Sequence, residues 1–201
     1  QQSKNLTAGE GGILLTNDDE LALKLWSFAN QGRSPAGAWY EHGMLGSNLR
    51  MTGWQAGVLL AQMERMDEQL ARRQANARRL NEILEEIEGP APMRWDPRAD
   101  NHAFHLYMMR YSPKKFGGLP RERFVEALRA EGVPCSTGYA QPLYKQPPLA
   151  PPHSRILPCP VAEQACREVV WLTQNMLLAE PEAMEEIGRA IVKIRENVHE
   201  L

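Results

Sequence analysis

The chain has 201 residues, of which 43% are hydrophobic and 24% are charged. This is enough for one medium-sized globular domain, or two small ones, with a hydrophobic core. The formal net charge of −2 argues against nucleic acid or an anionic membrane as the main partner. No apolar run is long enough to cross a membrane, and the polar first residues lack the apolar stretch of a signal peptide.

The first half of the chain reads as a loop-rich region followed by a long helix. Residues 1–12 are polar and rich in glycine, and the short apolar run at 13–16 predicts a buried strand. A helix is expected from Asp18 or Asp19 to about Asn30, and the segment 31–50 is a long loop of the kind that often carries function. Residues 53–87 predict one kinked helix or two helices end to end.

A basic cluster interrupts the long helical region, and it consists of Arg72, Arg73, Arg78 and Arg79. We expect it on the solvated face of the helix, with a phosphate site as the less favoured alternative. The second half then alternates between strands and helices. Strands are predicted at 103–111, 133–136 and 169–172, and helices at 120–131, at 161–168 and from 181 onward. Residues 138–160 form a proline-rich loop. The fold class is therefore α/β.

The histidines and cysteines do not predict a metal site. His102 and His105 would point to opposite faces of a strand-like run. Cys159 and Cys166 lack zinc spacing, so small buried thiols are the simpler interpretation. With Cys135 they make an odd and sparse set, which favours a reducing compartment. We therefore expect a cytoplasmic protein without a metal.

Lys4 is the sharpest candidate for chemistry. A lysine in a Gly-rich loop is usually solvated, but it can also form a Schiff base with a carbonyl cofactor. The string from Lys4 through the Gly-Glu-Gly-Gly run at 9–12 to Asp18 resembles the sugar aminotransferase family called DegT/DnrJ/EryC1/StrS. In that family the lysine of this string holds pyridoxal 5′-phosphate (PLP). The resemblance therefore implies that Lys4 is both the catalytic and the cofactor-binding residue.

Two further stretches resemble the same family. Residues 46–51 are similar to its Gly-x-Asn-x-Arg-Met loop, whose asparagine reaches the cofactor phosphate of the partner subunit. This implies a cofactor-binding role for Asn48, which alone would read as an ordinary turn or N-cap residue. Arg50 fits either a substrate phosphate or a buried ion pair, and the sequence leaves both open. Residues 104–144 are similar to the family's small domain, and Tyr139 within them is a candidate substrate-binding residue.

The resemblance implies the type I PLP-dependent transferase fold, which is aspartate aminotransferase-like. Residues 1–52 would be the end of the large PLP-binding domain, 53–88 a helical connector and 89–201 the small C-terminal α/β domain. It also implies a homodimer that moves an amino group from glutamine or glutamate to a keto-sugar or ketocyclitol. Residues 159–178 are similar to the subgroup that aminates keto-inositols with glutamine as donor.

Two other functions stay open. Relatives that dehydrate sugars replace the lysine by histidine, which Lys4 disfavours. A non-catalytic dimerisation or regulatory remnant of the same fold is the other alternative. The groups that contact the cofactor's ring nitrogen, its ring face and part of its phosphate come from the N-terminal half of family members. We therefore expect residues upstream of Gln1 in the full-length protein, and no activity from these 201 residues alone.

Overall fold

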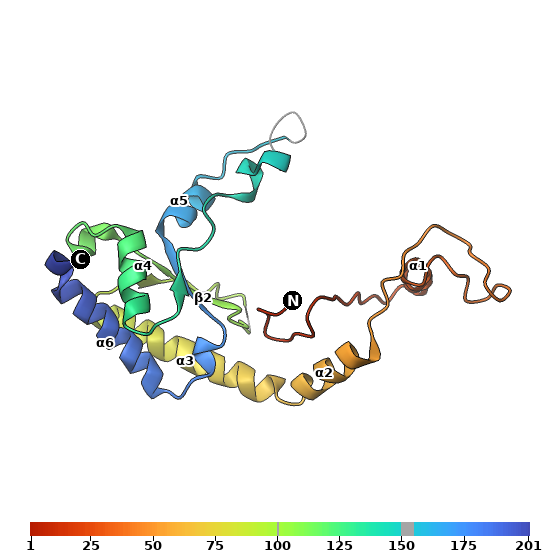
Figure 1. Ribbon diagram of the computed structural model, residues 1–201, viewed down its shortest axis with the longest axis horizontal. Helices are drawn as coiled ribbons and strands as arrows, with labels where there is room; N and C mark the ends of the chain where they lie inside the picture. The colour runs from red at the N-terminus through yellow and green to blue at the C-terminus, as the bar shows by residue number, and fades with distance from the viewer. Residues whose placement is uncertain (100, 150–154) are drawn as a thin grey trace. The chain divides into compact units, whose positions relative to one another are not determined.

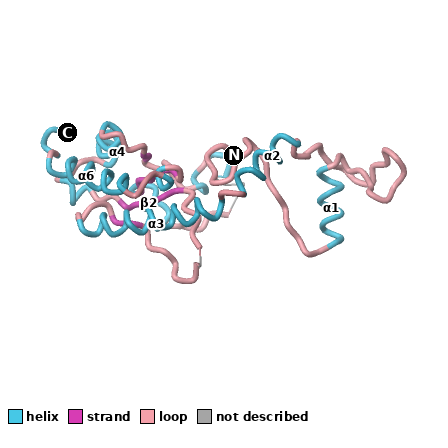
Figure 2. The backbone as a smooth tube through the Cα atoms, turned by 90° about the horizontal axis from the view of Figure 1, so that it is seen from below, coloured by secondary structure: helices cyan, strands magenta, loops and turns pink. Residues whose placement is uncertain are grey.

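The computed structural model describes residues 1–99, 101–149 and 155–201, and the chain divides into two compact units, Gln1–Met66 and Asp67–Leu201. The first unit is mostly loop, with the helices α1 (Asp19–Ala29) and α2 (Gly53–Met63), as Figure 2 shows by colour. Asp18 caps α1 by accepting a hydrogen bond from the backbone nitrogen of Leu21 at 3.0 Å, which confirms the predicted helix start.

The strand predicted at residues 13–16 is wrong. The segment has no regular structure, and Ile13, Leu14 and Leu15 are 80%, 73% and 85% exposed. A strand is stable only when neighbouring strands take up its backbone hydrogen bonds. The described residues of this unit contain isolated bridges but no strand that would pair with the segment. The segment is apolar, as a buried strand would be, but the first unit, which is described in full, contains no neighbouring strand for it.

The long helical region is two helices end to end, as one of the two sequence alternatives proposed. The helix α2 ends at Met63, and α3 (Met66–Glu86) follows after a short break. The second unit then contains a sheet of four antiparallel strands in the order β1-β2-β4-β3. The strands are β1 (Ala91–Pro92), β2 (Leu106–Arg110), β3 (Cys135–Ser136) and β4 (Val169–Thr173).

Three helices predicted for the second half are confirmed: α4 (Arg121–Ala130), α5 (Pro160–Glu168) and α6 (Glu182–Glu196). Short 3-10 turns lie between the helices and strands, at Pro113–Phe116, Leu143–Lys145, Pro147–Leu149 and Met176–Leu178, and a further one, Val198–Glu200, follows α6. Figure 1 shows α3 and α6 running along one another, and the ion pair between Arg79 and Glu185 joins them at 2.6 Å.

One face of the sheet belongs to the hydrophobic core. Tyr107 pairs with Leu172 and Met109 with Val170, and all four side chains are buried. Successive residues of a strand point to opposite faces, so Trp171 lies on the other face of the sheet. The same core contains apolar side chains of α3, α4 and α6, among them Leu80, Leu84, Phe124, Leu128, Ile187 and Ile191. Burying each such side chain contributes about 1.5–3 kcal/mol.

The prediction that the whole basic cluster of α3 is solvated is wrong at Arg73. This side chain is only 3% exposed, and its Nε and one terminal nitrogen donate to Oε1 of Gln174 at 3.1 and 2.6 Å. Burial lowers the pKa of this guanidinium. The reason is helical periodicity, since Arg73 precedes the buried Ala77 and Leu80 by four and seven residues.

The cysteines also differ from the prediction. All three are free, but only Cys135 is buried, whereas Cys159 is exposed and Cys166 lies between these extremes. Cys159 directly precedes α5, a helix without buried residues, so it lies outside the core.

Candidate functional site

Lys4 lies in the irregular loop that opens the first unit. Its backbone N–H donates to the carbonyl oxygen of Gln1 at 3.1 Å, and the residue is exposed. Thr7 and Ala8, farther along the loop, are half-buried. Lys4 thus lies in the exposed first part of a loop whose middle, residues 5–8, is half-buried.

Two glutamines of α2 hold this loop by its backbone. Gln62 accepts a hydrogen bond from the amide nitrogen of Thr7 at 3.0 Å and donates to the carbonyl oxygen of the same residue at 2.5 Å. Gln55 donates to the carbonyl oxygens of Ala8 at 3.3 Å and Glu10 at 2.8 Å. No role was predicted for either glutamine from the sequence. Their spacing of seven residues, about two helical turns, is the signal that would have placed them on one face.

Asn48 lies in the loop between α1 and α2, and backbone hydrogen bonds fix this loop to the end of α1. The amide nitrogens of Ser47 and Leu49 donate to the carbonyl oxygens of Phe28 and Ala29 at 2.8 and 2.9 Å. Gly46 makes this approach possible, because a Cβ at that position would lie 2.4 Å from the backbone nitrogen of Gly32. The glycine of the Gly-x-Asn-x-Arg-Met stretch is therefore required for steric reasons.

The structure brings Asn48 and Arg50 together. Nε of Arg50 donates to Oδ1 of Asn48 at 2.9 Å, and both residues are exposed. The carboxamide of Asn48 also carries an NH₂ donor, and the guanidinium of Arg50 is always charged. Two such donors suit an anion with several oxygens, such as a phosphate. Both alternatives for Arg50, a substrate phosphate and a buried ion pair, remain predictions.

A hollow of about 570 Å³ lies beside the Lys4 loop, within the first unit. Its lining includes Leu6, Gly9, Gly12, Met51, Leu59 and Met63, and Lys4 is not part of it. Apolar walls of this kind suit an apolar group rather than a phosphate. The hollow therefore does not itself form the anion site.

Tyr139, the predicted substrate residue, belongs to the second unit. It is 72% exposed, and its ring meets the ring of Trp171 edge-on, with centroids 5.1 Å apart. Gly138 before it has a φ of +79°, and a Cβ there would lie 3.2 Å from the Trp171 ring. Tyr139 therefore projects from the face of the sheet opposite the core, and glycine is required beside it.

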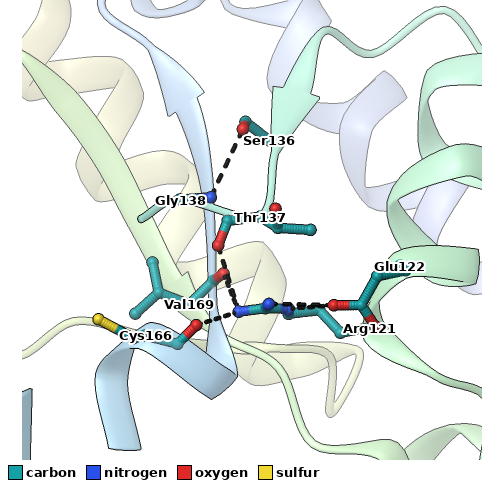
Figure 3. A network of polar contacts seen from close by, with 7 residues as sticks. All are labelled: Arg121, Glu122, Ser136, Thr137, Gly138, Cys166 and Val169. Atoms are coloured by element: carbon teal, nitrogen blue, oxygen red, sulfur yellow. Dashed lines mark hydrogen bonds and ion pairs between the residues drawn. The ribbon is translucent and has the colours of Figure 1, made fainter. Parts of the chain in front are cut away.

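Arg121 fixes the segment that carries Tyr139. One terminal nitrogen of its guanidinium donates to the carbonyl oxygens of Cys166 at 2.7 Å, Thr137 at 3.2 Å and Val169 at 3.3 Å. Figure 3 shows these three carbonyls converging on one side chain. The other donors of the guanidinium reach Glu122 at 3.0 and 3.3 Å. Arg121 thereby ties the start of β4, the end of α5 and the segment after β3 into one cluster.

Glu163 of α5 fastens the proline-rich loop that follows Tyr139. Its two carboxylate oxygens bind Nζ of Lys145 at 2.9 Å and the hydroxyl of Tyr144 at 2.5 Å. The hydrogen bond from Lys145, and then that from Tyr144, lowers the pKa of Glu163. The same pairing raises the pKa of both Lys145 and Tyr144. The ion pair with Lys145 and the hydrogen bond with Tyr144 thus hold this loop to α5.

The part of the chain that the structure describes contains neither a cluster of metal ligands nor a membrane-spanning helix. Within residues 1–99, 101–149 and 155–201, no three His, Cys, Asp or Glu side chains gather as metal ligands. No helix in these ranges is long and apolar enough to cross a membrane.

The sequence profile of the DegT/DnrJ/EryC1/StrS aminotransferase family matches residues 1–192. The chain belongs to this family. Among its family relatives, the putative L-glutamine:3-amino-2,3-dideoxy-scyllo-inosose aminotransferase of Streptoalloteichus tenebrarius is 33% identical. The L-glutamine:scyllo-inosose aminotransferase of Streptomyces griseus is 34% identical. Each match covers 100% of this chain and 53% of the relative, so the chain spans about half the length of these relatives.

A solved family structure gives the same relationship in three dimensions. The crystal structure of 3-amino-5-hydroxybenzoic acid synthase superimposes with a TM-score of 0.83 at 26% identity, over 100% of this chain and 53% of the other. The structure of DesV from S. venezuelae, solved in complex with a ketimine intermediate, superimposes with a TM-score of 0.73 at 27% identity, over 91% of this chain and 46% of the other. The fold of this DegT/DnrJ/EryC1/StrS chain is therefore the type I fold of PLP-dependent transferases, as the sequence predicted.

The residues of this family member fit PLP in chemical type. The cofactor needs a primary amine for its aldehyde and donors for its phosphate. Lys4 carries a primary amine at an exposed loop position. Asn48 and Arg50 carry hydrogen-bond donors and are joined by a hydrogen bond from Nε of Arg50 to Oδ1 of Asn48. Lys4, Asn48 and Arg50 lie in the first unit, whereas Tyr139 lies in the second.

Proposed function

We propose that the intact protein containing this chain is a PLP-dependent aminotransferase that moves the amino group of glutamine to a ketocyclitol. One observation carries the proposal. The whole chain matches an L-glutamine:2-deoxy-scyllo-inosose aminotransferase at 33% identity and an L-glutamine:scyllo-inosose aminotransferase at 34% identity. A keto-sugar as acceptor and glutamate as donor are the neighbouring possibilities. The three free cysteines support a cytoplasmic location.

Lys4 is the catalytic residue of this proposal. PLP, when bound, supplies an electrophilic carbon for the nitrogen and a ring that takes up the electron pair of a broken C–H bond. Nζ of Lys4 holds the cofactor between turnovers. Once displaced as a free amine, Nζ takes the proton from the α-carbon of the donor, and in the second half-reaction it returns a proton to the former ketone carbon.

Asn48 and Arg50 are the proposed hydrogen-bond donors to the cofactor phosphate. The NH₂ group of Asn48 and the guanidinium of Arg50 bind and orient phosphate oxygens, while their mutual hydrogen bond keeps the two side chains in register. In a homodimer Asn48 serves the neighbouring subunit's site, as in the family. Arg50 remains also a candidate for a substrate phosphate when the acceptor is a nucleotide-linked sugar.

Tyr139 is the proposed substrate contact of the second unit. Its ring stands edge-on to Trp171, so its exposed face and hydroxyl are available to a polyhydroxylated ring. We propose the family's division of the chain: residues 1–52 complete the large domain, 53–88 connect, and 89–201 form the small domain. Tyr139 then acts from the small domain.

A nitrogen-transfer assay tests the proposal. The intact protein is incubated with PLP, glutamine labelled with ¹⁵N at its α-amino group, and a panel of ketocyclitols and nucleotide-linked keto-sugars. We expect the label in an amine product of a ketocyclitol, and no label in the product mixture of the Lys4→Ala variant. A dehydratase would instead remove water from the sugar without incorporating ¹⁵N. If no ketone of the panel gains the label, the proposed function is wrong.

A further inference from the structure

The two glutamines of α2 connect the segments that carry the candidate cofactor residues. Gln55 and Gln62 lie about two turns apart on one face of the helix, and both reach the backbone that follows Lys4. Both side chains are half-buried. Half-buried carboxamides that each satisfy backbone groups of a loop have a defined geometry, unlike solvated glutamines of a helix surface.

Gln62 holds the loop in both position and orientation. Its Oε1 accepts from the amide nitrogen of Thr7 and its Nε2 donates to the carbonyl oxygen of Thr7, so that one carboxamide satisfies both polar groups of one residue. Nε2 also donates to the carbonyl oxygen of Val58 at 3.1 Å, within the same helix. Thr7 follows Lys4 by three residues, so the Cα atoms of the two residues lie at most about 11 Å apart.

Gln55 serves both candidate cofactor segments at once. Its Nε2 donates to the carbonyl oxygens of Ala8 and Glu10 in the Lys4 loop. Its Oε1 accepts from the backbone nitrogen and the hydroxyl of Thr52, each at 3.1 Å, and this contact forms the capping box that begins α2. Thr52 follows Asn48 by four residues. A single side chain therefore joins the loop after Lys4 to the segment after Asn48.

We propose that Gln55 and Gln62 are positioning residues for Lys4. They hold residues 7–10 against α2, so the accessible end of the loop presents the amine of Lys4 at a fixed place. Neither glutamine touches the reacting atoms, and both act through the loop backbone. This inference rests on the proposed function of Lys4. A misplacement of about 1 Å in such a group costs on the order of 10²-fold in rate.

The test compares Gln62→Glu and Gln62→Met with the intact wild-type protein. The glutamate keeps the length and the acceptor for the Thr7 amide, but sets an oxygen against the Thr7 carbonyl oxygen. The methionine keeps the length and removes both contacts. Gln69→Glu is the matched control, because it adds the same charge on α3, where Gln69 makes no side-chain hydrogen bond within the described residues.

The first readout is hydrogen–deuterium exchange of the intact protein without added PLP. We expect exchange of the amides at residues 6–10 to rise about fivefold in both Gln62 variants, since each variant loses at least one hydrogen bond to the loop backbone. Exchange in α1 should stay as in the wild type, as should exchange throughout Gln69→Glu. Unchanged exchange at residues 6–10 overturns the inference. An equal rise along the whole chain also overturns it, because it reports general destabilisation.

The second readout is kinetic and chemical. With PLP bound, we expect kcat to fall by about 10- to 100-fold in the Gln62 variants, with KM for the ketone nearly unchanged. The fraction of Lys4 trapped by borohydride reduction should fall with it. Unchanged kcat and trapping, in spite of a more mobile loop, would overturn the positioning role. If the wild type transfers no nitrogen at all, the proposed function fails, while the exchange result still decides whether Gln62 holds the loop.

Discussion

The carboxamide of Gln62 and the backbone of Thr7 form a two-point hydrogen-bonded pair, with distances of 2.5 and 3.0 Å. The partners are 55 residues apart in sequence but belong to the same compact unit. With Gln55 bound to both Thr52 and the loop, the two candidate cofactor segments share one support, the helix α2. On this proposal, the position of Lys4 depends on a helix that contains none of the candidate catalytic residues.

Gly46→Ala should disturb the Asn48 loop. An added Cβ would lie 2.4 Å from the backbone nitrogen of Gly32, and forced packing of this kind costs about 1–3 kcal/mol. We expect at least a tenfold weaker binding of PLP by the intact protein, measured by absorbance titration. Gly43→Ala is the control, since its Cβ would lie 3.9 Å from the nearest atom, Cβ of Ser34. Equal PLP affinities of the two variants would disprove the steric role of Gly46.

Arg121→Met should destabilise the second unit by about 1–3 kcal/mol, because carbonyl oxygens that are partly shielded from water lose their donor. Chemical denaturation of the intact protein measures the loss. Arg123→Met on the same helix is the control. Its contacts to Glu126 and to the carbonyl oxygen of Leu201 are both exposed, so their loss should change stability by less than about 0.5 kcal/mol. If both variants unfold at the same denaturant concentration, the carbonyl cluster does not contribute as argued.

The loop held by Glu163 should loosen in acid. The hydrogen bonds from Lys145 and Tyr144 lower the pKa of Glu163, so the folded protein keeps this carboxylate charged at a pH where the unfolded chain would protonate it. Its stabilising contribution is therefore present above the ordinary glutamate value of about 4.3 and is lost as the pH falls through the lower folded value.

Hydrogen exchange of residues 143–149, followed from pH 6 downward and corrected for the intrinsic rate, would detect this release. Glu163→Gln should show raised exchange at every pH, without an acid transition. A transition in the wild type above the ordinary glutamate value would contradict the direction of the pKa change.

Much of the second unit was predictable from the sequence. Its strands and helices follow local periodicity, and the core positions of α6 and β4 are read from spacings of three to four and of two. The burial of Arg73 was not predicted, because an arginine is normally expected on a solvated face even where helical spacing places it beside core residues. The family motif identified the candidate residues Lys4 and Asn48, whose roles remain predictions.

What the sequence did not predict depends on contacts over long distances in the chain. The strand at residues 13–16 had the right composition, but a strand forms only beside a partner. The hydrogen bonds of Gln62 to Thr7 and of Arg121 to three carbonyls join segments that no local pattern relates. Polar side chains that bind backbone groups leave no periodic trace in a sequence, so only the folded chain reveals them.

Mapping the covalent attachment of PLP tests the central claim most directly. The intact protein is saturated with PLP, reduced with borohydride, digested and analysed by mass spectrometry. We predict that the reduced pyridoxyl group is found on Lys4, and that Lys4→Ala removes both this adduct and the cofactor's absorbance band. Attachment to a different lysine, or no attachment in a protein that stays folded, would contradict the account.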